Sequence, residues 1–252
     1  MAEKLKYFVN GQFRESKTDK WYDLHNPSTG EITGQAPCCT NDEVLEAIAA
    51  AKAAYPGWSA TPAIKRAQIL YRVRELILER MDELTMSVAK ENGKVGAETE
   101  GDGLKAKEGT GESIMAASRG YDTVKYREPL GVFAGIVPVN FPAMIPFGWM
   151  APTCIATGNT LVLKAASLTP KTAMLFAQLY KDAGVPDGVI NVVTCSRNEI
   201  NTILEHPDVK GITFVGSTPV GLKIYEKAAA NGKRCQALCQ AKNHALVMED
   251  CA

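Results

Sequence analysis

A long stretch without any charged side chain, from Leu130 to Leu163, constrains the fold of this chain most strongly. Its length and apolar character could suggest a membrane helix, but four prolines interrupt it: Pro138, Pro142, Pro146 and Pro152. A membrane helix tolerates one or two such breaks. A buried strand–helix–strand unit explains all four, because prolines fit the turns and helix starts between buried elements. We therefore predict a protein core here, with no membrane partner.

The residues after this stretch continue an alternation of short apolar runs and amphipathic segments. We predict strands at 132–138, 160–165, 189–194, 211–216, 234–239 and 244–249, and helices at 142–157, 170–184, 197–206 and 219–231. Apolar strands that alternate with helices favour a parallel sheet covered on both faces. The predicted fold class is α/β, with a Rossmann-like parallel sheet that has helices on both faces.

The N-terminal part carries turn and helix signals of a different kind. Asn10-Gly11 between two short apolar runs predicts a β-hairpin over 7–14. Thr40 and Glu43 form a capping-box pattern that opens an alanine-rich helix. Thr61-Pro62 predicts an N-cap and a first-turn proline for one long helix, whose buried stripe is Leu70, Val73, Ile77, Met81, Leu84 and Val88.

These signals divide the chain into three parts. Residues 1–120 hold the hairpin, the N-terminal helices and a glycine-rich connector at 96–120, for which we predict a loop or a frayed helix. Residues 121–131 are predicted to form an exposed strand, and residues 132–252 are predicted to form the core with the parallel sheet.

Composition excludes several classes of partner. The chain has 252 residues with 28 basic and 28 acidic side chains, so its zero net charge gives no reason to expect nucleic acid. Seven cysteines without a C-x-x-C spacing, beside only three histidines, favour no metal site. Scattered cysteines in odd number are typical of reduced thiols, and no N-terminal segment has the pattern of a signal peptide. We expect a cytoplasmic protein.

The turn Pro138-Val139-Asn140-Phe141-Pro142 follows the strand of the uncharged stretch. Two prolines hold one polar side chain on a stiff turn, so the Asn140 amide could donate to a negative charge that develops on a substrate oxygen. The pentapeptide is equally consistent with an ordinary proline-punctuated turn between a strand and a helix.

Two further segments lie at predicted strand ends. Lys164 ends the strand over 160–165, where doubly wound sheets bind ligands, although a solvated cation fits equally well. Gly216-Ser217-Thr218-Pro219-Val220-Gly221 opens a helix after a strand, which suits a phosphate, but it is neither a Walker A loop nor a G-x-G-x-x-G fingerprint. Alone, it is better read as an N-cap with a packing glycine. Together, the cation and the helix N-terminus predict a dinucleotide site.

These motifs resemble the signatures of the aldehyde dehydrogenase superfamily, in order and approximate spacing, together with Arg127-Glu128-Pro129-Leu130-Gly131-Val132. Within it the chain looks most like the methylmalonate-semialdehyde dehydrogenases, because Ala229-Ala230-Asn231-Gly232-Lys233-Arg234 and Ala241-Lys242-Asn243-His244 are similar to that subgroup's run. The resemblance covers nearly the whole chain and corresponds to the N-terminal, cofactor-binding half of such enzymes, with the catalytic domain absent. It implies that residues 121–131 are the strand of a small β oligomerisation element and that residues 132–252 are a Rossmann-like dinucleotide-binding core.

The resemblance implies NAD or NADP as cofactor and a role for each matching residue. Asn140 would stand in the oxyanion hole as the one catalytic residue, and Lys164 would contact the adenosine ribose. The implied cofactor-binding set is Val137, Pro138, Lys164, Ser167, Gly216, Ser217 and Gly221. It also implies a small semialdehyde, such as methylmalonate or malonate semialdehyde, as substrate, and homo-oligomers (dimers or tetramers) formed through the N-terminal strands and a hairpin near 121–127.

Several positions depart from the family pattern. The family's nucleophilic cysteine falls beyond Ala252, and we read Cys235 and Cys239 as buried strand thiols. Ala237 replaces the glutamate that activates water in many relatives, as in the subgroup that releases its acyl group to coenzyme A. Ser167 replaces a glutamate typical of NAD-preferring relatives, so we expect NADP to be tolerated or preferred.

The segment between Glu98 and Ser113 is shorter than the family's helix at this place, and Lys105 and Lys107 are the nearest candidates to meet a substrate carboxylate. A lysine supplies charge without the bidentate fork of the subgroup's arginine. Two hypotheses remain open: the cofactor-binding half of a semialdehyde oxidoreductase, or a non-catalytic half-length module that binds dinucleotide or a subunit. The retained motifs favour the first.

Overall fold

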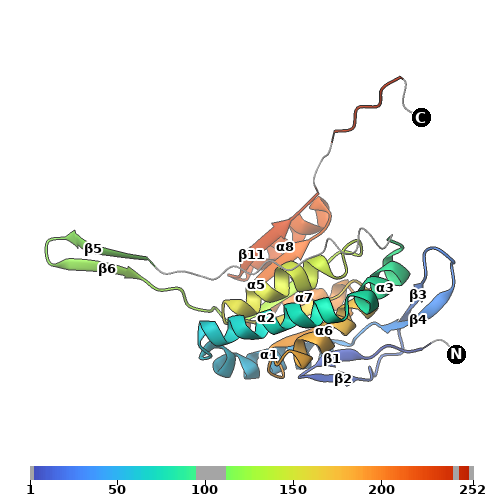
Figure 1. Ribbon diagram of the computed structural model, residues 1–252, viewed down its shortest axis with the longest axis horizontal. Coiled ribbons are helices and arrows are strands. Elements are labelled where there is room, and N and C mark those ends of the chain that lie inside the picture. The colour runs from blue at the N-terminus through green and yellow to red at the C-terminus, as the bar shows by residue number, and fades with distance from the viewer. Residues whose placement is uncertain (1–2, 95–111, 241–243, 250–252) are drawn as a thin grey trace.

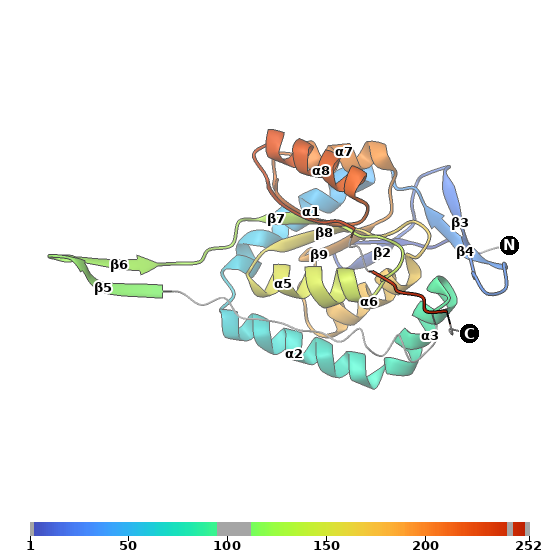
Figure 2. The ribbon, with the colours of Figure 1, turned by 90° about the horizontal axis from the view of Figure 1, so that it is seen from above.

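The computed structural model describes residues 3–94, 112–240 and 244–249. A seven-stranded sheet in the order β11-β10-β7-β8-β9-β1-β2 runs through the body, with helices on both of its faces (Figure 1; Figure 2). Five of its strands are mutually parallel: β7 (Val132–Ile136), β8 (Thr160–Lys164), β9 (Ile190–Val193), β10 (Val209–Val215) and β11 (Arg234–Leu238). The predicted α/β class with a parallel sheet is confirmed.

The N-terminal hairpin extends this sheet. β1 (Tyr7–Val9) and β2 (Gln12–Arg14) are antiparallel, and β1 pairs with β9 through Phe8 and Val192. Asn10 and Gly11 have φ angles of 50° and 69°, the left-handed backbone that a two-residue hairpin turn needs. The predicted hairpin is confirmed, and it completes one edge of the core sheet.

Three layers of helices surround the sheet. α1 (Asn41–Ser59), α7 (Arg197–Glu205) and α8 (Thr218–Ala230) cover one face, and α5 (Ala151–Ala156) and α6 (Lys171–Asp182) cover part of the other (Figure 2). α2 (Ala63–Glu79) and α3 (Met81–Asn92) pack outside α5 and α6. The buried strand patterns of β8 and β9 follow from this double cover.

The helix starts confirm one prediction and correct another. Thr40 and Glu43 form the predicted capping box at α1. The next helix has Pro62 as its N-cap, without a side-chain cap, because the Thr61 hydroxyl donates to the Gly57 carbonyl at 3.0 Å. The predicted single helix is two helices, since the backbone of Arg80 departs from helical geometry at φ −112°.

The uncharged stretch forms the predicted strand–helix–strand unit with one unforeseen feature. Residues Met144–Met150 form a π-helix, η1, ahead of α5. Pro146 has no N–H to donate to the carbonyl of Pro142, so the ordinary α-helical ladder cannot form at this point. The Ala151 N–H donates to the carbonyl of Pro146, five residues back, which is the π-helical pattern.

Buried polar contacts fasten this unit to its neighbours. The Asn159 Oδ1 atom accepts from the N–H groups of Leu130 and Gly131 at 2.7 and 3.1 Å. The Trp58 indole of α1 donates to the Ile155 carbonyl at 3.0 Å. Each bond satisfies a buried group that would be costly to leave unpaired.

Two small hairpins lie outside the main sheet. β3 (Trp21–His25) pairs with β4 (Ile32–Pro37), and β5 (Glu112–Ser118) pairs with β6 (Tyr121–Lys125). The β5–β6 hairpin projects from the body as a separate arm (Figure 1). The predicted loop or frayed helix is wrong for 112–118, because these residues pair with the strand predicted after them. The division into three parts is otherwise not tested.

The last predicted strand is also wrong. Residues 244–248 are extended without pairing to any part of the chain that the structure describes, and Leu246 is 87% exposed. The segment leads away from the body after β11 (Figure 1). Its apolar sequence has strand character, but a strand forms only beside a neighbour. Within the described ranges, no helix has the length and apolar character needed to cross a membrane.

Candidate functional site

The carboxyl ends of three adjacent strands bring the predicted site residues to one edge of the sheet. Ile136 at the end of β7 is paired in register with Lys164 of β8 and with Phe214 of β10. The chain runs from β7 to β8 and β9 on one side and then crosses to β10 on the other. The topological switch point therefore lies at the carboxyl ends of β7 and β10, which is where doubly wound sheets bind ligands.

Hydrogen bonds with residues of other elements hold the turn that follows β7. Val137 is buried and its N–H donates to the Lys164 carbonyl at 3.4 Å, and Pro138 follows half-buried. The Val139 carbonyl accepts from the Asn92 amide at 2.8 Å and from Thr169 at 3.4 Å. These bonds fix the backbone just before Asn140.

Asn140 itself is exposed, and its amide makes no hydrogen bond to any described residue. A fixed backbone with a free amide is the arrangement that a preorganised hydrogen-bond donor requires. The structure thus agrees with the expected presentation of Asn140, while its catalytic role remains a prediction.

Lys164 ends β8 with a half-buried side chain. Burial lowers the pKa of its ammonium group, and the nearby thiols of Cys195 and Cys38 oppose that shift. Within the described ranges Lys164 makes no ion pair or hydrogen bond through its side chain. A partly desolvated cation without a partner favours an anionic or hydroxyl-rich ligand. Ser167 lies three residues further on, in the loop that leaves the same strand, and is half-buried.

The segment after β10 begins α8. Ser217 is the N-cap in extended conformation, but its side chain makes no capping bond, so its hydroxyl is available at the helix N-terminus. The Gly216 N–H donates to the Leu238 carbonyl at 3.1 Å, which joins this turn to the end of β11. Together these features place a helix N-terminus beside the switch point, as predicted.

The two glycines of this segment are required by packing. A Cβ atom on Gly216 would lie 2.5 Å from the Phe214 ring, and one on Gly221 would lie 2.4 Å from the Cys239 sulfur. Both distances are too short for any side chain without movement of a neighbour. The packing explanation for the glycines is sufficient, and their predicted contact with a cofactor is not tested.

The cysteines fall into two groups. Burial raises the pKa of the Cys39 and Cys195 thiols to about 12, and it raises the pKa of Cys154 further. Such thiols are poor nucleophiles at neutral pH. The interpretation of Cys239 as a buried strand thiol is wrong, because Cys239 lies exposed just after β11, and Cys235 is only half-buried. Among the residues that the structure describes, no group of three histidine, cysteine or acidic side chains could hold a metal ion.

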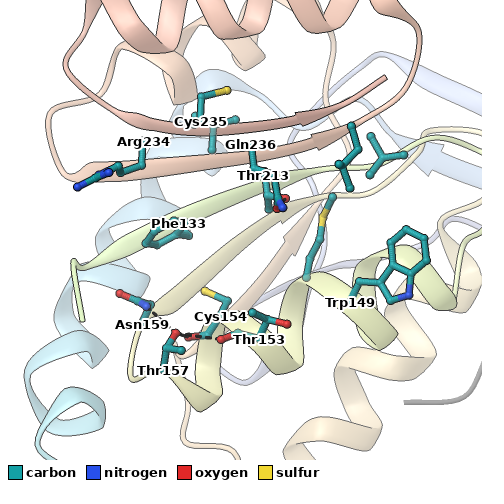
Figure 3. Close-up of a pocket in the computed structure, with 14 residues that line it drawn as sticks. Phe133, Trp149, Thr153, Cys154, Thr157, Asn159, Thr213, Arg234, Cys235 and Gln236 are labelled. Carbon is teal, nitrogen blue, oxygen red and sulfur yellow. Dashed lines mark hydrogen bonds between the residues drawn. The ribbon is translucent and has the colours of Figure 1, made fainter. Parts of the chain in front are cut away.

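Sequence reasoning missed a hollow of about 560 Å³ on the face of β10 and β11 opposite α8 (Figure 3). β11 alternates exposed and half-buried residues, in line with its alternating sequence RCQAL. A strand covered on both faces would instead be a continuous apolar run, so this alternation was the available signal that one face of β11 is open. Figure 3 shows the side chains of η1 and α5 on one wall and those of β10 and β11 on the other. The lining comprises Phe133, Trp149, Met150, Thr153, Cys154, Thr157, Asn159, Ile212, Thr213, Val215, Arg234, Cys235, Gln236 and Leu238.

Some predicted site features lie outside the described residues. These are Lys105 and Lys107, the candidates to meet a substrate carboxylate. The first three residues of the run Ala241-Lys242-Asn243-His244, which carries part of the family resemblance, also lie outside them.

The fold is that of a doubly wound α/β protein, and the carboxyl ends of β7 and β10 form its switch point, where such proteins bind ligands. A model of the aldehyde dehydrogenase family matches residues 13–252, and the chain belongs to that family. The rat mitochondrial "methylmalonate-semialdehyde/malonate-semialdehyde dehydrogenase [acylating]" is 43% identical over 257 positions, which cover 98% of this chain and 48% of the rat protein. "Malonate-semialdehyde dehydrogenase 1" of Geobacillus thermodenitrificans is 44% identical over 260 positions, which cover 99% of this chain and 54% of that protein.

Solved structures agree with these relatives. The "putative methylmalonate-semialdehyde dehydrogenase" of Sinorhizobium meliloti, complexed with NAD, superposes with a TM-score of 0.90 at 34% identity, over 97% of this chain and 52% of that one. The methylmalonate-semialdehyde dehydrogenase DddC of Oceanimonas doudoroffii gives a TM-score of 0.89 at 38% identity, over 96% of this chain and 51% of that one. The chain therefore spans about half the length of the relatives it matches.

Proposed function

We propose that this chain is the cofactor-binding half of an NAD(P)-dependent oxidoreductase that oxidises a small semialdehyde, with malonate or methylmalonate semialdehyde as substrate. The observation that carries the proposal is the register of β10, β7 and β8, whose adjacent carboxyl ends lead to the start of α8, to Asn140 and to Lys164. The names of the relatives support the substrate class, and the NAD in the Sinorhizobium meliloti structure supports the cofactor.

The residues of the edge have distinct proposed tasks. Lys164 would hold the ribose hydroxyls, and Val137, Pro138, Gly216, Ser217 and Gly221 would line the dinucleotide. The fixed turn would aim the Asn140 amide at the substrate oxygen, where one preorganised donor contributes about 2.7–4 kcal/mol to transition-state stabilisation. The bound nicotinamide would supply the hydride acceptor.

The chain alone would not complete the reaction. Its buried thiols have raised pKa values, and Cys235 and Cys239 do not occupy the family's nucleophile motif. A thiolate nucleophile is needed to form the covalent intermediate of such an oxidation. Ala237 cannot activate water, so we propose coenzyme A as acyl acceptor of the complete enzyme. We also propose a homo-oligomer, a dimer or a tetramer, and a cytoplasmic location.

Ser167 is proposed to admit NADP. A serine in the loop after β8 does not repel a 2′-phosphate, and Lys164, the last residue of β8, precedes it by three residues. Calorimetric titration of the chain with NAD and with NADP should give equal or tighter binding of NADP, and Ser167→Glu should weaken NADP binding while NAD binding persists. Much tighter binding of NAD than of NADP by the unaltered chain would contradict this.

The dinucleotide role as a whole is tested by the same titration with Lys164→Met. We expect the affinity for both cofactors to fall by about tenfold to hundredfold, since one charge-assisted hydrogen bond contributes about 1.5–3 kcal/mol. Lys65→Met, on the exposed side of α2, is the matched control and should bind both cofactors normally. Absence of any binding of either cofactor by the unaltered chain would overturn the proposed function.

A further inference from the structure

The helix α2, which forms the outer layer on its side of the sheet, carries an exposed apolar stripe (Figure 2). Ile64, Tyr71 and Leu78 are spaced seven residues apart, so they lie on one side of the helix, about two turns from one another. They are 61%, 66% and 52% exposed. α2 packs on α5 and α6 through its opposite side, where Leu70 and Val73 are buried. The stripe therefore contributes little to the core.

The regular spacing of the stripe indicates what kind of element fits it. Apolar residues scattered singly over a surface are common and need no explanation. An apolar repeat of seven residues is instead the pattern by which two helices pack along each other. A second helix is therefore the partner that matches this face.

The stripe is symmetric about its middle residue. α2 spans Ala63–Glu79, so Tyr71 is its central residue, and Ile64 and Leu78 lie seven residues to either side. When a second copy of α2 runs in the opposite direction, Tyr71 meets Tyr71 of that copy, and Ile64 of each copy meets Leu78 of the other. The same surface then serves on both sides, which is the condition for a closed two-fold dimer.

The charged side chains favour the same antiparallel direction. Residues 63–74 carry four basic side chains and no acidic one, whereas residues 75–83 carry four acidic side chains and one basic one. Arg72 pairs with Glu75 and Glu79 within the helix at 3.0 and 3.2 Å. Even with these pairs counted, the start of the segment is basic and its end is acidic. Antiparallel copies bring opposite charges together, whereas parallel copies would bring like charges together.

We propose that α2 is a self-association surface through which two copies of this chain pair, with their α2 helices antiparallel and Tyr71 at the two-fold axis. Each copy contributes one helix, so the interface is small and the dimer is weak and concentration-dependent. This contact is separate from the β5–β6 arm, and the inference does not depend on the proposed cofactor.

Sedimentation equilibrium of the chain over a range of concentrations measures the pairing. Tyr71→Asp brings two carboxylates together at the axis and should lower the association constant by about tenfold or more. Tyr225→Asp is the matched control, because Tyr225 is an aromatic residue of α8, on the other side of the sheet, and is 54% exposed. It should associate as the unaltered chain does. Association through any other surface is common to these proteins and cancels in the comparison.

A pair of substitutions tests the antiparallel register. Ile64→Lys and Leu78→Glu should each weaken the pairing, because each sets a charge against an apolar side chain of the second copy. The double variant should associate about tenfold more tightly than either single variant, since a lysine and a glutamate then face each other at both ends of the pair. Along one helix these two positions are about 21 Å apart, so a contact within one chain cannot produce this recovery.

Three results would overturn the proposal. The first is an unaltered chain that stays monomeric at every concentration. The second is equal association of Tyr71→Asp and Tyr225→Asp, which would mean that the stripe serves a different partner or none. The third is a double variant of Ile64 and Leu78 that associates no more tightly than its single variants.

Discussion

The two ends of the parallel sheet differ in how completely this chain covers them. At one end, β8 and β9 lie between α1 on one face and α5 and α6 on the other, and their residues are almost all buried. At the other end, β11 packs on α8 through one face and borders the hollow with its other face. The first end builds a closed core, whereas the second leaves one face of β11 open to the hollow. The predicted cofactor edge lies between them.

Two leucines provide the sharpest contrast between these ends. Leu161 of β8 is fully buried, whereas Leu238 of β11 is 43% exposed. Leu161→Ala should lower the free energy of unfolding by about 2–5 kcal/mol, because it leaves a cavity in close-packed surroundings. Leu238→Ala should cost less than about 1 kcal/mol. Urea denaturation followed by circular dichroism measures both, and equal costs would show that β11 is as well covered as β8.

The junction of α8 with the end of β11 should show a smaller, coupled effect. A Cβ atom on Gly221 would collide with the Cys239 sulfur at 2.4 Å, whereas Gly57 of α1 has no atom within 4 Å of such a position. Gly57→Ala should stabilise by up to about 1 kcal/mol through helix propensity.

Gly221→Ala should not show the stabilisation expected for Gly57→Ala. When Gly221→Ala is combined with Cys239→Ala, about 1 kcal/mol of the free energy of unfolding should be restored. A double-mutant cycle in urea measures this coupling, and the pair Gly57→Ala with Cys239→Ala should show none. Additive effects at Gly221 and Cys239 would mean that the two residues do not touch in solution.

The smallest expected effect is the pH dependence that Lys164 contributes. Burial lowers the pKa of Lys164 below its ordinary value of 10.5. In the window just below 10.5 the unfolded chain binds a proton that the folded chain has lost, so stability rises with pH in that window.

At pH 7 the unaltered chain should therefore have a lower free energy of unfolding than Lys164→Met. This difference should become smaller as pH rises toward 10. Unfolding midpoints in urea across this range measure the difference, with Lys65→Met as control. A constant difference between chain and variant at all pH values would contradict burial of the ammonium group.

Local sequence rules predicted the elements whose causes are local. The turn at Asn10-Gly11, the capping box of Thr40 with Glu43 and the strand–helix–strand unit of the uncharged stretch depend on neighbouring residues, and the structure confirms each. The general geometry of parallel sheets predicted that Pro138, Lys164 and Gly216 lie at the same, carboxyl end of neighbouring strands.

The errors arose where the outcome depends on distant contacts. Residues 244–249 have strand composition, but pairing needs a neighbour that the described chain does not provide. The hollow was missed although β11 alternates along its length, because the extent of the hollow depends on which helices cover β10 and β11. The π-helix at 144–150 follows from the missing N–H of Pro146, a local cause whose result differs from the ordinary helix expected there.

Hydrogen exchange of the chain with and without NAD tests the central claim most directly. The account predicts slower exchange at 138–141, at 164–167 and at 216–221, the three segments of the shared edge, and unchanged exchange at 153–157 and 234–236, which border the hollow. Protection confined to the hollow, or no change at 216–221 under saturating NAD, would contradict the assignment of the cofactor to the carboxyl edge of β10, β7 and β8.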